Sequence, residues 1–230
     1  EVLVLSEYGI SRVSRPVHLN RIFRKRGWLQ VKDELGLETL DCGGSKVFAV
    51  ADHQIAHVYV NDTSIADEVR EVVLAADGVE EIRESSDLWG KGIAADRGGD
   101  FVAVSDEDAW FTYYFWEDDS KAPDFARCID IHRKPGYDPV ELFLDPDLKF
   151  PLVKIAKFLA KKKLGFRGLM DVIPLNANLV KGSHGRDTVA PQEQPVAIGR
   201  GAGQVTSAEE VFFWIRDSLT NSVSGDSNAR

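Results

Sequence analysis

The chain has 230 residues, of which 43% are hydrophobic, so it is long and apolar enough to bury a core and wholesale disorder is not expected. Its formal net charge is −9, which argues against nucleic acid or an anionic membrane as the main partner but permits a local anion site. The two cysteines, Cys42 and Cys128, are too few for a disulfide scaffold and form no C-x-x-C pair, so we expect reduced thiols in a cytoplasmic protein.

An unbroken apolar run opens the chain. Residues Val2–Leu5, bounded by Ser6 and Gly9, predict a strand buried in a parallel sheet. Such a strand needs neighbours on both sides, and the first residue is Glu1 rather than Met. We therefore expect a fragment of a longer chain, whose partner is the amino-terminal half of the same protein.

The order of the predicted elements changes along the chain. A helix at 16–26 and a strand at 28–31 indicate an α/β core. The following segment predicts strands at 47–50, 55–60, 79–82, 101–104 and 110–116, with a helix at about 61–76. We expect residues 36–120 to form an α+β lid subdomain inserted into a core made of 1–35 and 121–221.

Two helices are predicted beyond the lid. The first covers 153–163, with Ile155, Ala156 and Leu159 inward and a solvated stripe of lysines outward. The second follows a capping box at Thr206–Glu209. Residues 222–230 are small and polar, and we expect them to be a flexible tail.

Two short motifs carry residues suited to chemistry. Ser6-Glu7-Tyr8-Gly9 follows the opening strand, and in open α/β sheets ligands bind beyond the carboxyl ends of strands. Gly182-Ser183-His184-Gly185 places a histidine between glycines, where a neutral imidazole could bind a zinc-like ion. Taken singly, a strand end with a glycine turn and a loop histidine without a function explain the two motifs equally well or better.

The two motifs together resemble the carboxy-terminal part of the type I phosphodiesterase and nucleotide pyrophosphatase branch of the alkaline phosphatase superfamily, including its phosphonoacetate hydrolase-like members. Two further stretches, Ala51–Val60 and Asp130–Pro139, share the resemblance, which extends over nearly the whole chain. It implies part of an alkaline-phosphatase-like α/β core sheet with the lid inserted between the motifs. It also implies hydrolysis of phosphate esters or nucleotide-like small molecules.

The resemblance implies a site with two divalent metal ions, zinc in most members, that activate a Thr or Ser alkoxide. Glu7 occupies the position of the family's metal-binding Asp, Tyr8 that of its metal-binding His, and His184 that of its late histidine ligand. The nucleophile is expected upstream, so no catalytic residue is assigned here and we expect the isolated chain to be inactive. We also expect Glu7 and His184 to converge.

The Tyr8 substitution supports a second hypothesis. A phenol keeps its proton at neutral pH, so it binds a metal well only where the ion helps to remove that proton. Glu7, by contrast, keeps an oxygen ligand on a longer side chain. The alternative is therefore a degenerate, non-catalytic binding or structural module with the same fold.

Five other residues are candidates for substrate binding. His53 and His57 would lie on one strand face, about 13 Å apart, too far for one ion, so packing or a lid hydrogen bond is the favoured interpretation. His132, Arg133 and Lys134 could bind an anion, or could form an ion-paired loop with nearby carboxylates. The aromatic residues between Trp110 and Trp116 are better explained by core packing than by stacking on a ligand.

Overall fold

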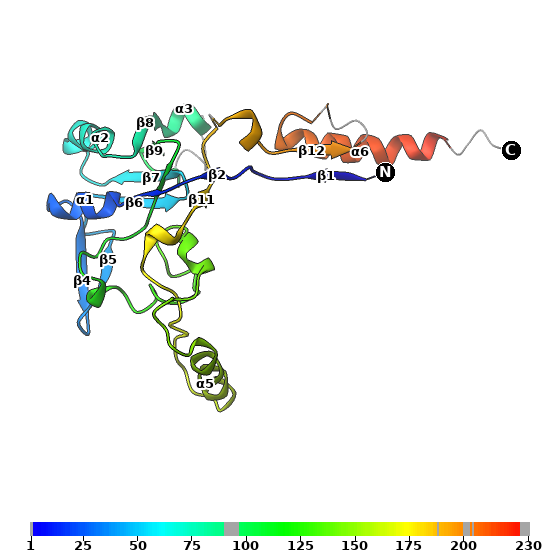
Figure 1. The fold of residues 1–230 in the computed structure, drawn as a ribbon. Helices are drawn as coiled ribbons and strands as arrows, with labels where there is room; N and C mark the ends of the chain where they lie inside the picture. Colours follow the sequence, from blue (N-terminus) through cyan, green and yellow to red (C-terminus); the bar gives the residue numbers. More distant parts are fainter. Residues whose placement is uncertain (1, 90–96, 188, 200–202, 204, 226–230) are drawn as a thin grey trace. The chain divides into compact units, whose positions relative to one another are not determined.

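The computed structural model of the protein describes residues 2–89, 97–187, 189–199, 203 and 205–225 (Figure 1). Contacts divide the chain into two compact units. One unit combines Glu1–Ile10 with Thr188–Arg230, and the other is Ser11–Asp187.

The first unit contains a two-stranded ribbon. Strand β1 (Leu3–Leu5) pairs antiparallel with β12 (Ala197–Gly199), with Val4 opposite Ile198. The predicted buried parallel strand is wrong, because β1 is antiparallel and Val4 is 59% exposed. An apolar run indicates that a strand can be buried on both faces, but it does not specify which strands will cover it.

Helix α6 (Ala208–Gly225) follows in the same unit. The backbone N–H groups of Thr206 and Ser207 donate to one carboxylate oxygen of Glu210, at 2.5 and 3.1 Å. The predicted box used Glu209, which is one residue too early, because the helix begins at Ala208 and Glu210 is its third residue. Residues 222–225 of the predicted flexible tail belong to α6, and the remainder of that tail, 226–230, lies outside the described residues.

The second unit is organised around a four-stranded antiparallel sheet of order β6-β7-β9-β8. Alternate residues of β6 and β7, from Val47 and Ala49 to Val58 and Val60, turn one face of this hairpin toward the core. The central strand β9 is buried along its whole length. The four strands are β6 (Val47–Asp52), β7 (Ile55–Val60), β8 (Val79–Glu84) and β9 (Phe101–Ser105).

Shorter elements surround this sheet. Strands β4 and β5 form a hairpin, β10 pairs parallel with β3, and β11 pairs antiparallel with β2. These strands are β2 (Ser11–Arg12), β3 (Arg15–Val17), β4 (Gln30–Glu34), β5 (Leu37–Asp41), β10 (Ala109–Phe111) and β11 (Gly182–Ser183). The helices of this unit are α1 (Leu19–Lys25), α2 (Ala66–Leu74), α3 (Ser85–Trp89) and α5 (Pro151–Lys163). Short 3-10 helices cover Thr63–Ile65, Asp119–Lys121, Pro139–Leu142, Ala177–Leu179 and, in the first unit, Pro191–Glu193.

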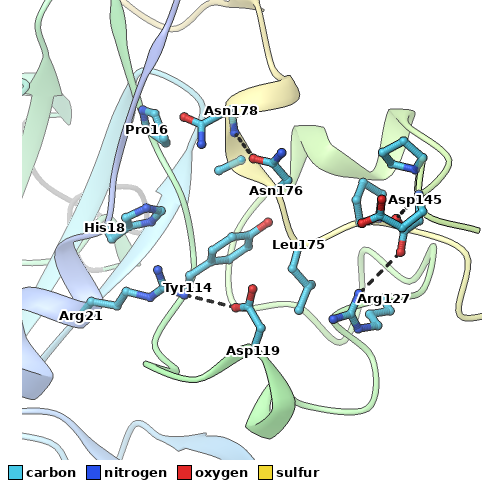
Figure 2. Close-up of a pocket in the computed structure, with 14 residues that line it drawn as sticks. Pro16, His18, Arg21, Tyr114, Asp119, Arg127, Asp145, Leu175, Asn176 and Asn178 are labelled. Atoms are coloured by element: carbon cyan, nitrogen blue, oxygen red, sulfur yellow. Dashed lines mark hydrogen bonds and ion pairs between the residues drawn. The ribbon is translucent and has the colours of Figure 1, made fainter.

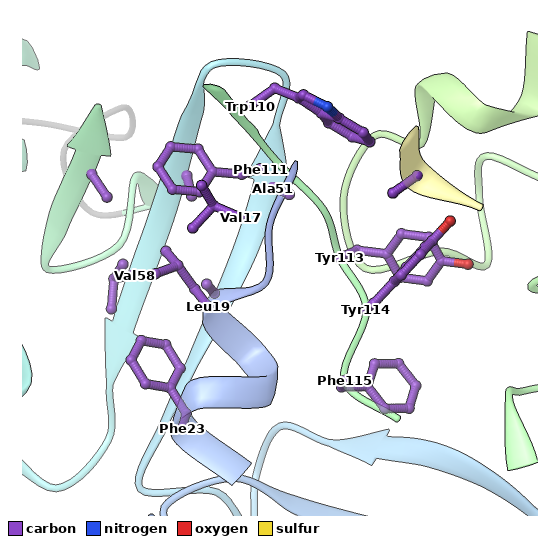
Figure 3. Close-up of a cluster of buried hydrophobic side chains, with 14 of the residues drawn as sticks. Val17, Leu19, Phe23, Ala51, Val58, Trp110, Phe111, Tyr113, Tyr114 and Phe115 are labelled. Atoms are coloured by element: carbon purple, nitrogen blue, oxygen red, sulfur yellow. The ribbon is translucent and has the colours of Figure 1, made fainter. Parts of the chain in front are cut away.

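Helix α1 and the aromatic segment provide much of the core. Figure 3 shows Leu19 and Phe23 of α1 in one cluster with Val58 of β7 and Phe111 of β10. Phe23 is fully buried, which contributes roughly 1.5–3 kcal/mol relative to an exposed side chain. Pro16 was predicted to lie in the first helix, but this helix begins only at Leu19. Pro16 instead lies in β3, opposite Trp110 of β10.

The aromatic residues from Trp110 to Trp116 are almost fully buried, as the packing interpretation predicted. The predicted strand ends at Phe111, however, and the remaining residues continue without strand pairing. Their bulk rather than ladder hydrogen bonds accounts for their burial, with Tyr113 and Trp116 in edge-to-face contact at 5.4 Å.

Helix α5 buries only part of the face that its pattern predicts, since of the three residues expected inward only Ile155 is partly buried and packs against the core. Ala156 and Leu159 are exposed, and Leu159 keeps 54% of its surface accessible. Lys157 and Lys161 are exposed and Lys154 is half-buried, as expected of a solvated stripe, and all three line a groove with residues 166–171. An amphipathic period specifies two faces, but it does not specify which face meets the rest of the protein.

The edge strand β6 is closed by a side chain instead of a further strand. The Asn20 amide donates to the Ala49 carbonyl at 2.8 Å and accepts from the Ala49 N–H at 2.8 Å. Asn20 is 1% exposed, so this pair satisfies two buried backbone groups that the sheet leaves open. The mixed α/β class is confirmed, and the assignment of 36–120 to a lid stays a prediction.

We expect Asn20→Ala to lower the free energy of unfolding by about 2–4 kcal/mol, because the Ala49 N–H and carbonyl would be left buried and unpaired. Denaturant unfolding of the chain measures this change. Asn178→Ala is the matched control, since Asn178 is exposed and, among the described residues, only its backbone N–H takes part in a hydrogen bond. Equal losses in the two variants would contradict the role of Asn20.

Candidate active site

The turn between β6 and β7 presents a histidine in an unusual backbone conformation. His53 and Gln54 alone connect the two strands, and φ of His53 is 58°. A non-glycine residue in this region costs on the order of 1–3 kcal/mol and persists only where its surroundings enforce it. The His53 carbonyl accepts from the Phe111 N–H at 2.7 Å, and the Gln54 side chain donates to the carbonyls of Glu107 and Ala109.

A second segment reaches the same turn from the loop around Gly136. The Tyr137 N–H donates to the Ala51 carbonyl at 2.8 Å, and Gly136 forms a parallel bridge with Ala51. Gly136 has φ 121°, and a Cβ there would lie 2.6 Å from the Ala51 carbonyl oxygen. Glycine is therefore required for the loop to approach β6 this closely.

The third segment is the loop that carries His184. The His184 carbonyl accepts from the Gln54 N–H at 2.9 Å, and β11, which precedes it, pairs with β2. Arg186 is ion-paired with Glu80, and Asp187 with Arg83 at 2.6 Å. The loop is thus held on both sides of the histidine, and Gly185 allows its turn with φ 115°.

These three segments bring together rings that are distant in the sequence. The His53 ring packs against His184 in a tilted arrangement with a centroid distance of 3.8 Å, and it stacks on Tyr137 at 4.2 Å. The Nδ1 atom of His53 lies 2.7 Å from a carboxylate oxygen of Asp52. Hydrogen bonding to His53, with smaller contributions from the charges of His57 and His184, lowers the pKa of the Asp52 carboxyl despite its partial burial.

The other half of the predicted metal set belongs to the first unit. Glu7 and Tyr8 follow β1 directly, at its carboxyl end, and both are exposed. Ser6, at the start of the motif, exchanges hydrogen bonds with Val196 at 2.9 and 3.0 Å. Since His184 belongs to the second unit, the convergence of Glu7 and His184 stays a prediction.

His53 and His57 do not share a strand face. Strand β7 begins at Ile55, so His53 lies in the turn and His57 in the strand. The hairpin lacks the Asn-Gly type of sequence that marks a two-residue turn, which is why the sequence placed His53 in the strand. The Nδ1 atom of His57 lies 2.7 Å from the Gly98 carbonyl, a hydrogen bond of the kind expected for a lid histidine.

The predicted cationic trio divides between surface and core. His132 is exposed, and Arg133 is paired with Asp124 at 2.8 Å. The Lys134 side chain is fully buried and lies 2.8 and 2.6 Å from the carboxylates of Asp138 and Glu141. These pairs match the ion-paired-loop alternative in form, and a role for the trio in substrate binding stays a prediction.

The donors of each unit do not by themselves fit a metal ion. Among the residues that the structure describes, no three His, Cys, Asp or Glu side chains are arranged to hold one. In the second unit the residues near His184 are His53, whose ring packs against it at a centroid distance of 3.8 Å, and Asp52, whose carboxylate lies nearby. Asp52 and Tyr137 were not predicted as site residues, although both lie in the stretches that carry the family resemblance.

The comparison with family models identifies the class of protein. The model of type I phosphodiesterase / nucleotide pyrophosphatase matches residues 1–138. The chain belongs to this family, as the resemblance predicted. The match includes Glu7, Tyr8, Asp52 and His53, whereas His184 lies beyond its end.

The solved structures with similarity to the chain include phosphonoacetate hydrolase from Sinorhizobium meliloti 1021. Its complex with phosphonoformate matches with 16% identity and a TM-score of 0.35, and its complex with phosphonoacetate with 17% and 0.34. Each match covers 49% of this chain and 28% of the hydrolase chain, so the chain spans less than a third of that protein. No curated protein matches the chain significantly. None of the described helices has the length and apolar character needed to cross a membrane.

The lowered pKa of Asp52 gives a test of the histidine contact. A carboxyl with a lowered folded-state pKa stabilises the fold above its unfolded-state pKa, and this contribution is lost as pH falls through the folded-state value. Because the Asp52 side chain is 53% exposed, solvent screens the effect. We expect NMR titration to show a lowered pKa for Asp52 that His53→Ala raises toward its ordinary value. His57→Ala, the matched control, should raise the pKa less; a larger effect of His57→Ala would contradict the assignment.

Proposed function

We propose that this chain is part of a metal-dependent phosphodiesterase or nucleotide pyrophosphatase that acts on phosphate esters or nucleotide-like small molecules. Sequence upstream of Glu1 supplies the Thr or Ser nucleophile, and the intact enzyme uses two divalent ions, zinc in the first instance. The contribution of this chain is to supply Glu7, Tyr8 and His184 as metal ligands. The ions, when bound, activate the nucleophile and neutralise charge on the phosphoryl oxygens.

The observation that carries the proposal is the meeting of three loop segments at the β6–β7 turn. They come from the stretches that resemble the family, and they hold His184 by its backbone and by its ring. A ligand held in this way loses little freedom on binding an ion, because neighbouring groups already orient the histidine. His53 then serves as a positioning residue for His184, and Asp52 orients His53.

The second candidate function is a degenerate, non-catalytic module of the same family. Tyr8 at the position of the family's histidine ligand favours it, because a phenol must lose its proton to bind a metal well. The retained His184 in its glycine loop favours the enzyme.

Zinc binding by the 230-residue chain tests the proposal without any activity assay. Calorimetry should detect Zn²⁺ binding that His184→Ala weakens about tenfold or more, because an imidazole nitrogen ligand is lost. His132→Ala, which removes an exposed histidine, is the matched control and should leave the affinity unchanged. Tyr8→His should tighten binding, since it restores the ligand of the family.

Two results would decide against the enzyme. Equal zinc affinity in wild type and His184→Ala would remove His184 from the ligand set. An absence of zinc binding in wild type, together with tight binding by Tyr8→His, would favour the degenerate module.

A further inference from the structure

A polar cavity of about 360 Å³ lies in the second unit, away from the residues of the candidate active site. Its walls come from the start of α1, from Tyr114, and from the segments around Asp119, Asp145 and Asn176 (Figure 2). None of Asp52, His53, Tyr137 and His184 belongs to its lining. The volume lies in the range of small-molecule sites.

One wall carries an incompletely neutralised cation. Arg21 donates from Nε to the Trp116 carbonyl at 2.6 Å, and its guanidinium forms a long ion pair, at 3.6 Å, with the Asp119 carboxylate, which also lines the cavity. Burial lowers the pKa of the Arg21 guanidinium, so its charge is costly without a closer anion. His18 beside it is neutral at physiological pH, because burial lowers its pKa to about 4. An anionic ligand group at this wall would therefore be stabilised by Arg21.

Tyr114 supplies a hydrogen-bonding group without a partner. The residue is 1% exposed, and its hydroxyl makes no hydrogen bond within the described part of the chain. Its ring is parallel to that of His18 with a centroid distance of 5.7 Å, and Figure 2 shows its hydroxyl directed toward the side of the cavity that holds Leu175 and Asn176. A buried hydroxyl left unpaired is destabilising, and a ligand acceptor that paired with it would remove that cost.

The segment at 145–147 contributes negative charge to the cavity. Asp145 and Asp147 both line the cavity, and Arg127 approaches Asp145 only to 3.7 Å. Asp147 is exposed and forms no ion pair with any residue that the structure describes. This part of the wall therefore favours a ligand cation.

We propose that this cavity binds a small zwitterion, with a carboxylate at Arg21 and Tyr114 and an ammonium at Asp145 and Asp147. The guanidinium and the hydroxyl donate to the carboxylate, and the two aspartates accept from the ammonium. The prolines at 16, 146 and 174 and Leu175 cover the linking methylene groups. This inference goes beyond the proposed function, and it does not depend on metal binding.

Binding of ω-amino acids to the full chain tests the proposal. Calorimetry with β-alanine, 4-aminobutyrate and 6-aminohexanoate varies the spacing between the charged ends. We expect saturable binding of at least one, about tenfold or more tighter than that of butyrate or butylamine, which each carry one end. No saturable binding of any amino acid at millimolar concentration, or equal binding of butyrate, overturns the proposal.

Two conservative variants assign the two ends. Tyr114→Phe should weaken the best-binding amino acid about tenfold without lowering stability, because the hydroxyl it removes has no partner in the described chain. Tyr113→Phe is the matched control: that hydroxyl is also buried and has no hydrogen-bond partner among the described residues, but Tyr113 does not line the cavity. Asp145→Asn should weaken the amino acid and leave butyrate unchanged. Equal effects of Tyr113→Phe and Tyr114→Phe would overturn the site.

Discussion

The β6–β7 hairpin is the element to which the rest of the second unit is attached. Strand β6 is an edge of the four-stranded sheet, and an edge strand must have its backbone groups paired or exposed to water. Here Ala49 is paired by the Asn20 side chain and Ala51 by the Gly136–Tyr137 loop. The turn residues are also paired, because Gln54 donates to the His184 carbonyl and His53 accepts from the Phe111 N–H. One edge therefore fixes the helix, the aromatic segment and the candidate active site at the same time.

This constraint links backbone geometry to chemistry. The turn residue His53 adopts a positive φ, which the hydrogen bonds of its neighbours enforce. In that conformation its ring lies between those of Tyr137 and His184, and its Nδ1 atom reaches Asp52. A residue in a strained conformation among titratable groups is characteristic of functional sites. The fold thus holds the His184 backbone at this turn through the hydrogen bond from the Gln54 N–H, which suits its proposed role as a metal ligand.

The sequence predicted the local elements better than their environment. The strands at 47–60 and the helix after Asn61 follow from alternation and capping, and the structure contains both. The exposed face of α5 and the exposure of β1 could not be predicted, because hydrophobic patterns do not specify which partner covers a face. The grouping of His53 with His184 depends on a turn without glycine and on a contact across 131 residues (184 − 53). The family resemblance identified the right stretches, but the pairing between them is a property of the tertiary structure.

The grouping of rings at the hairpin turn can be measured directly by nuclear Overhauser effects in the 230-residue chain. The account predicts contacts from the ring protons of His53 to those of both His184 and Tyr137, since the ring centroids are 3.8 and 4.2 Å apart. In Gly136→Ala, whose Cβ would collide with the Ala51 backbone, the contact to Tyr137 should be lost while that to His184 remains. Gly165→Ala, at another positive φ but with open space around it, should preserve both contacts. An absence of any His53–His184 contact in the folded wild-type chain would contradict the account.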